Sequence, residues 1–154
     1  MPLGGIRIEN EKEFVREIKA FGDVEVPKRL QKVTQKASAF ALRRVVKRTP
    51  VGDPSIWAPQ SLPPPKGYRP GRARGGWQVG INRTTETDIN RIDPSGATAI
   101  ATGIAVIATA QPFDEVIIYN NVPYILPLEN GSSTQAPNGM VRLTILEIAA
   151  QRFD

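Results

Sequence analysis

The chain contains neither cysteine nor histidine among its 154 residues. Without cysteine there is no disulfide bond, no thiol nucleophile and no thiolate-bound metal. Without histidine the chain lacks the most common general base and zinc ligand, so it cannot assemble a Ser-His-Asp triad. A hydrolase or nuclease using carboxylates and a metal would draw on scattered acids that lack ligand-like spacing: Asp53, Asp88, Asp93 and Asp114. We therefore expect no enzyme, no metal and no cofactor.

Long apolar runs are missing as well. Glycine, proline and charged residues interrupt every apolar stretch well before the roughly 20 residues that cross a bilayer. Residues 1–5 lack the basic and then apolar pattern of a secretion signal. We expect a single domain over residues 1–154 that makes no membrane contact.

Acidic residues are absent from a long part of the chain, although the net charge is only +5. Eight basic residues and no acid lie between Val26 and Gly52: Lys28, Arg29, Lys32, Lys36, Arg43, Arg44, Lys47 and Arg48. Such an uneven distribution of charge suits an acidic partner, either nucleic acid or the surface of another subunit. A solvated helix face needs no partner and is the plainer alternative.

The first half of the chain predicts two helices. Residues 5–9 are expected to form a short strand, with Asn10 capping a helix that ends at Gly22. Its apolar face consists of Phe14, Ile18 and Phe21. A longer helix over residues 26–48 has Pro27 in its first turn and stops at Thr49-Pro50. Its apolar residues recur every three or four positions: Val26, Leu30, Val33, Ala37, Phe40, Ala41 and Val45.

The second half mixes strands and helices. Alternating residues predict a strand over 77–81, and residues 115–119 predict another. Residues 97–108 fit either type, but Asp93-Pro94-Ser95 resembles a helix start with proline at the first position, which favours a helix. Residues 139–153 predict a helix whose face contains Val141, Ile145, Ile148 and Ala149. Leu143 and Leu146 fall outside that face, so either they bury against a neighbouring subunit or the segment begins extended.

Prolines and glycines cluster over residues 50–76, which contain seven of the 14 prolines. This composition predicts a long loop or arm outside the packed core. Trp57 and Tyr68 on this arm either anchor a partner or fold back onto their own domain. The predicted class is therefore α+β, with a small antiparallel or mixed sheet packed against two or three helices and a proline-rich arm.

Three segments carry a resemblance to a known family. A basic helix ends in Arg48-Thr49-Pro50-Val51-Gly52-Asp53, and Gly71-Arg72-Ala73-Arg74-Gly75-Gly76-Trp77 enters a strand. Residues 93–108 lead to Val116-Ile117-Ile118-Tyr119-Asn120-Asn121, Pro123-Tyr124, Leu128-Glu129-Asn130-Gly131, Gln135-Ala136-Pro137 and Gly139-Met140-Val141. In this order the segments resemble the tail-component, neck or tail-completion proteins of tailed bacteriophages. The proline-rich insertion departs from the shorter spacing of that family.

The resemblance implies a structural virion protein made in the host cytoplasm. Its copies would form a ring, most plausibly a hexamer, that joins the connector or head-closure proteins to the tail terminator or tail tube. Genomic DNA would pass through the lumen and contact the basic helix without sequence preference. The alternatives are a tail terminator or a sequence-independent DNA-binding module. Candidate subunit contacts are Trp57, Tyr68, Arg72, Arg74, Tyr124, Glu129, Gln135 and Met140.

Overall fold

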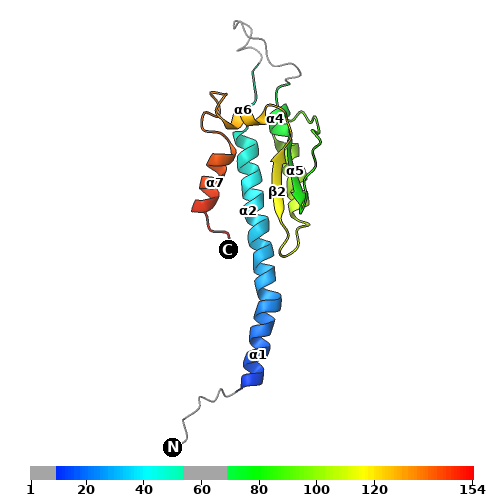
Figure 1. Cartoon of the computed structure of the whole chain (residues 1–154), viewed down its shortest axis with the longest axis vertical. Coiled ribbons are helices and arrows are strands. Elements are labelled where there is room, and N and C mark those ends of the chain that lie inside the picture. The colour runs from blue at the N-terminus through cyan, green and yellow to red at the C-terminus, as the bar shows by residue number, and fades with distance from the viewer. Residues whose placement is uncertain (1–9, 54–68) are drawn as a thin grey trace, which may run out of the picture.

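One continuous helical rod runs through the molecule. In the computed structural model, which describes residues 10–53 and 69–154, α1 (Glu11–Ala20) passes through a π-helical turn, η1 (Phe21–Glu25), into α2 (Val26–Arg48). Figure 1 shows the other elements gathered around the upper part of α2, while α1 extends away from them. The predicted strand over residues 5–9 lies outside the described residues.

The predicted helix end at Gly22 is wrong, because the chain continues through η1. The Val26 amide donates to the Phe21 carbonyl, five residues back, so this turn accommodates one extra residue. Pro27, which lacks an amide hydrogen, follows directly and fits at the start of α2. Asn10 precedes α1 but makes no side-chain cap. The predicted end of α2 is confirmed, with extended backbone at Thr49.

Two strands form the sheet on one side of α2. β1 (Trp77–Ile81) and β2 (Val116–Asn120) pair antiparallel, with Val79 opposite Ile118. α5 (Ala97–Ile107) packs against both α2 and β1, while α7 (Val141–Ala150) packs against α2 (Figure 1). Two short helices, α4 (Arg72–Gly75) and α6 (Ile125–Glu129), connect these elements. The predicted α+β class is confirmed, as are the strand over 77–81 and the helical choice for 97–108.

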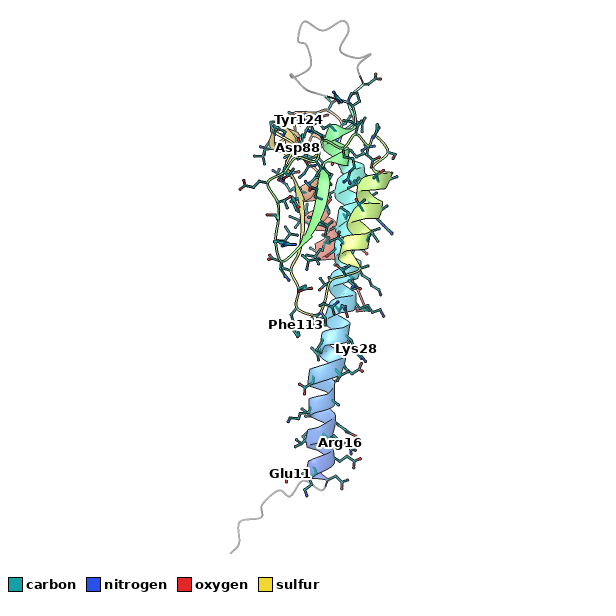
Figure 2. The ribbon with its side chains drawn as sticks, turned by 90° about the vertical axis from the view of Figure 1, so that its right-hand side faces the viewer. Glu11, Arg16, Lys28, Asp88, Phe113 and Tyr124 are labelled. Carbon is teal, nitrogen blue, oxygen red and sulfur yellow. The ribbon has the colours of Figure 1, made fainter. Side chains whose placement is uncertain are left out.

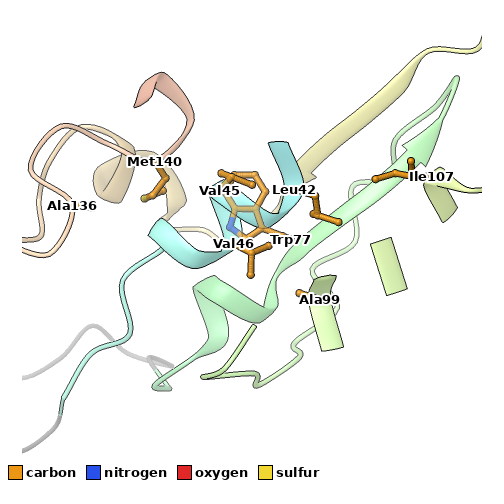
Figure 3. Packing of buried hydrophobic residues seen from close by; sticks show 8 residues of the cluster. All are labelled: Leu42, Val45, Val46, Trp77, Ala99, Ile107, Ala136 and Met140. Carbon is orange, nitrogen blue, oxygen red and sulfur yellow. The ribbon is translucent and has the colours of Figure 1, made fainter. Parts of the chain in front are cut away.

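The core forms where α2 meets the sheet, α5 and the segment before α7 (Figure 3). Its buried members are Leu42, Val45, Val46, Trp77, Ala99, Ile107, Ala136 and Met140. Gly103 permits the close packing of α5, because a Cβ there would lie 2.4 Å from Leu42 Cδ2 and 2.9 Å from Val79 Cγ2. Only glycine fits at that position without displacing a neighbour.

A buried polar chain joins the end of α2 to the start of β1. The Trp77 indole donates to the Thr49 hydroxyl over 2.7 Å, and that hydroxyl donates to the Val45 carbonyl over 2.7 Å. The Arg74 Nε donates to the Thr49 carbonyl over 2.9 Å. These bonds satisfy polar groups that would otherwise be costly to bury, so they fix the angle at which the chain leaves and re-enters the core.

The start of α5 differs from the sequence prediction. The helix begins at Ala97, so Pro94 does not occupy its first position. Asp93 still provides the cap, because its buried carboxylate accepts the amides of Gly96 and Ala99 and the Ser95 hydroxyl, each within 2.9 Å. Burial would raise the pKa of Asp93, but these hydrogen bonds outweigh it and lower the pKa below its usual value.

The predicted arm ends before residue 76. Residues 54–68, which include Trp57 and Tyr68, lie outside the described residues. Arg72–Gly75 forms the helical turn α4, and Ala73 and Gly75 are buried. Asn120 stabilises this turn from β2 by donating to the Ala73 carbonyl over 2.8 Å, which explains why a glycine-rich segment joins the core. Within residues 10–53 and 69–154, no helix is both long and apolar enough to cross a bilayer.

Candidate assembly interface

The predicted basic residues of α2 divide into two groups by height along the helix. Around the body, several are bound within the chain. Lys47 donates to the Ser95 carbonyl over 2.9 Å, and Lys36 donates to the Asp154 carbonyl. Lower on the rod, none of the ion pairs among the described residues includes Lys28, Arg29 or Lys32. These three exposed cations are therefore the part of the predicted set most open to an acidic partner.

Glu147 on α7 neutralises two of the candidates. Its carboxylate forms ion pairs with Arg48 and with Arg44, the latter over 3.1 Å, and Arg48 also donates to the Thr144 hydroxyl over 3.1 Å. The hydrogen bond from Arg48 and the charges of both arginines lower the pKa of Glu147. Arg44 and Arg48 thus hold α7 against α2, a structural role that the basic pattern alone did not reveal.

A basic hollow lies beside α2 on the side facing α5. It has a volume of about 440 Å³ and is lined by Phe40, Arg43, Arg44, Lys47 and Ile100. The Arg44 guanidinium lies 5.1 Å from the centre of the Phe40 ring, which restricts its position. Its open shape, three cations and apolar floor suit a flexible anionic surface better than a small molecule enclosed on all sides.

Two arginines of the predicted interface set act inside the chain. Arg72 forms a largely buried ion pair with Asp88. Arg74 donates to the carbonyls of Thr49 and Pro94, the latter over 2.7 Å. Both side chains are therefore held by the loops around α4, where they support the fold.

Glu129 and Met140 also have internal roles. The Glu129 carboxylate accepts the amides of Met140, Val141 and Arg142 within 3.0 Å, so it fixes the loop and caps α7. Burial would raise the pKa of Glu129, but these bonds and the Arg142 charge lower it overall. The expectation for Met140 is wrong, since its side chain is fully buried and cannot reach a neighbouring subunit.

Gln135 and Tyr124 lie at the end of the body near the top of α2. Gln135 is exposed and donates to the Val51 carbonyl over 3.1 Å. Tyr124 is half-buried just before α6 and lies in the same region as Asp88 (Figure 2). Of the predicted interface residues that the structure describes, Gln135 is the most accessible.

An apolar groove was missed by the sequence interpretation. It lies between α7 and β2, with Ala41 and Val45 of α2 also lining it, and has a volume of about 100 Å³. Its lining residues are Ala41, Val45, Trp77, Ile118, Val141, Thr144, Ile145 and Ile148.

The predicted face of α7 is rotated relative to the observed one. Thr144 is buried against α2, whereas Ile145 and Leu146 are 58% and 63% exposed. Thr144 can be buried because its hydroxyl donates to the Met140 carbonyl over 2.7 Å and accepts Arg48. Leu146 is exposed and Leu143 is half-buried, and both lie within the helix, which begins at Val141.

Asp88, Asp93 and Asp114 are held by structural partners. Asp88 pairs with Arg72, Asp93 caps α5, and Asp114 accepts the Asn82 amide and the Gln111 backbone amide, each over 2.7 Å. Within the described ranges, no three acidic side chains converge in a way that would hold a metal ion. Asp53, Asp88, Asp93 and Asp114 therefore do not assemble the carboxylate site that a metal-dependent hydrolase requires.

Compared with protein-family models, curated proteins and solved structures, the chain matches none of them.

Proposed function

We propose that this chain is a structural subunit of the neck of a tailed bacteriophage, where copies form a ring around the DNA channel. The observation that carries the proposal is the amount of apolar surface left uncovered on a folded subunit. Ile145 lines the α7–β2 groove, Leu146 is exposed on the same helix, and Phe14, Ile18 and Phe21 lie exposed on the rod. Large apolar patches of this kind mark interfaces in soluble proteins.

The groove is suited to a contact between different surfaces of neighbouring copies. A neighbouring copy that places an apolar edge in this groove would repeat the contact around an axis and generate a ring. The cations Lys28, Arg29, Lys32 and Arg43 would then line either the channel or an acidic neighbouring ring. The ring size follows from the angle of that contact.

Assembly can be tested by measuring the mass of the purified chain at increasing concentration. We expect a discrete oligomer, and replacing Ile145 with Asp should convert it to smaller species. Arg152→Asp, which adds the same side chain at an exposed position beyond α7, is the matched control. A chain that stays monomeric at all concentrations, and is missing from purified particles, would contradict the proposal.

The second candidate is a sequence-independent DNA-binding module, favoured by the three unpaired lysine and arginine residues low on α2. It predicts binding to any duplex, with an affinity that falls steeply as salt rises. Replacing Lys28, Arg29 and Lys32 with Gln should weaken binding to unrelated duplexes equally. Absence of binding at low salt would eliminate this candidate.

A further inference from the structure

The apolar stripe on the rod is partly covered and partly free. In the upper part, the side of α2 that carries Phe40 is covered by the C-terminal segment, where Phe153 packs edge-on against Phe40 at 5.7 Å. Below Lys36, which binds the terminal residue, Ala110 accepts a hydrogen bond from Gln31 on α2, while the apolar members are exposed except for the half-buried Val26. The free stripe consists of Phe14, Ile18, Phe21, Val26, Leu30 and Val33.

The π-helical turn keeps this stripe straight. Residues before the turn recur at spacings of four and three, as do those after it, but Phe21 and Val26 are separated by five. In an uninterrupted α-helix that spacing would move the upper residues to another face. The five-residue turn closed by Val26 and Phe21 absorbs the extra residue. The result is one continuous apolar line of about 30 Å.

Charged residues follow one flank of the free stripe, because each directly precedes an apolar member in the sequence. In the lower half the flank is acidic, with Glu13 before Phe14 and Glu17 before Ile18. In the upper half Glu25 precedes Val26 beside the π-helical turn, and above it the flank is basic, with Arg29 before Leu30 and Lys32 before Val33. The lower half's own basic residues, Lys12, Arg16 and Lys19, do not directly precede a stripe residue, although Arg16 forms an exposed ion pair with Glu13 over 3.4 Å. Figure 2 shows the labelled Glu11, Arg16 and Lys28 on the part of the rod away from the body.

We propose that the free stripe is the docking surface for a second copy of this chain, paired with it in antiparallel orientation. In this arrangement the stripe matches itself about the π-helical turn: Phe14 faces Val33, Ile18 faces Leu30, and Phe21 faces Val26 of the other copy. Each aromatic ring is placed opposite a β-branched side chain, and the apolar residues form the seam of a two-stranded coiled coil.

Charge selects the antiparallel orientation. In an antiparallel pair, the charged flank of one helix lies beside the charged flank of the other. Glu13 and Glu17 of the first copy then lie beside Lys32 and Arg29 of the second. At the other end of the pair, Lys32 and Arg29 of the first copy lie beside Glu13 and Glu17 of the second. A parallel pair would gather the acidic halves at one end and the basic halves at the other, with no such complementarity. The contact is two-fold symmetric and closes at two copies. It leaves the α7–β2 groove free and does not depend on the virion role.

The stripe is tested by sedimentation of the full chain carrying Ile18→Asp, with Lys19→Asp as the matched control. Asp at position 18 would place an unpaired charge in the seam twice, so we expect the dimer to weaken at least about 100-fold. Lys19→Asp adds the same side chain on another side of the helix and should leave the dimer within about threefold of the original. Equal effects of the two variants would overturn the proposal. To separate this contact from ring contacts, the series is repeated in an Ile145→Asp background.

Charge reversal tests the orientation. Glu13→Lys with Glu17→Lys, or Arg29→Glu with Lys32→Glu, should each weaken the dimer about tenfold or more at low salt. All four changes together restore opposite charges in an antiparallel pair, so dimerisation should recover. These residues have similar helix propensities, so the swap leaves the helix intact. Failure of the fourfold variant to recover, with an unchanged melting temperature of the body, would overturn the orientation.

Cross-linking identifies the occupant, since the chain has no natural cysteine. We expect a disulfide when Phe14→Cys and Val33→Cys variants are mixed, and none when either is oxidised alone. A cross-link of Phe14→Cys to itself would indicate a parallel pair, and one between Phe14→Cys and Ile145→Cys would place the rod in a neighbour's groove. Either result, or a monomer that binds anionic lipid vesicles through the stripe, would overturn the proposal.

Discussion

The two halves of the rod both carry apolar residues, but their surroundings differ. Around the body, α2 is packed by the sheet, α5 and α7, and Leu42 and Val46 are fully buried. Along α1 and η1, every residue from Glu11 to Glu25 is exposed. An isolated helix of this length is only marginally stable in water. Amphipathic spacing therefore predicts an apolar helix face that packs against something. Within one chain, only the upper half of the rod has other elements packed against it.

The largest difference in the free energy of unfolding is expected between the Trp77→Ala and Phe14→Ala variants. Trp77 fills the core and donates to Thr49, so its loss should lower the free energy of unfolding by about 3–5 kcal/mol. Phe14 contacts solvent in a single copy, so its loss should change that free energy by less than about 0.5 kcal/mol in dilute solution. Chemical denaturation monitored by circular dichroism measures both. A large effect of Phe14→Ala on the dilute monomer would show that the lower half is not free.

Replacing two glycines in helical segments with alanine should change the free energy of unfolding in opposite directions. At Gly103 an added methyl group would overlap Leu42, so Gly103→Ala should cost about 1–3 kcal/mol. At Gly22 nothing lies within 4 Å of the added atom, so Gly22→Ala should stabilise the rod by about 0.5–1 kcal/mol through reduced backbone entropy. Urea unfolding of the body and helicity of the rod are the measurements. A Gly103→Ala variant that is as stable as the wild type or more stable would contradict the packing described for α5.

The Asp93 cap should make the body sensitive to acid. Asp93→Ala is expected to cost about 1–2 kcal/mol at neutral pH, because the amides of Gly96 and Ala99 lose their acceptor. The folded-state pKa of Asp93 is below its unfolded value, near 3.9. Its stabilisation is therefore present above the unfolded pKa and is lost as pH falls through the folded one. Thermal unfolding at pH 7 and pH 3 checks this: the gap between wild type and variant should narrow in acid, and a constant gap would contradict it.

The smallest effect is expected at the junction of α7 with α2. Glu147→Gln removes a partly exposed ion pair, so it should lower the stability only slightly. It also releases Arg44 and Arg48 from their carboxylate, so any binding of duplex DNA should strengthen a few-fold at low salt. Fluorescence anisotropy with labelled duplex measures the change. Unchanged binding would show that the upper basic residues do not contribute to an anionic interface.

Local patterns predicted the elements of the body well. Alternation identified β1 within its observed bounds, and alanine content with the Asp93 cap identified α5. The end predicted at Gly22 failed, because glycine ends a helix only where a left-handed residue is adopted, and here the wider turn keeps the chain helical. The orientation of α7 also failed, since Thr144 is buried through bonds to Met140 and Arg48 that apolar spacing does not encode.

The candidate interface was only partly predictable. The run of basic residues located an electropositive helix, but composition cannot show that Glu147, far along the chain, neutralises Arg44 and Arg48. Met140 was proposed for a contact loop, yet the Glu129 cap draws the start of α7 inward and buries it. The Phe14, Ile18 and Phe21 stripe was visible in the sequence. Its continuation to Val33 depends on η1, which no local signal indicated.

Amide hydrogen exchange at two protein concentrations tests the central claim most directly. If the lower half of the rod is covered by a second copy, protection of residues 11–33 should increase with concentration, while protection of Leu42, Val46 and Trp77 stays constant. Ile18→Asp should abolish that increase and Lys19→Asp should retain it. Fast exchange of residues 11–33 at every concentration, with an unchanged body, would contradict the account.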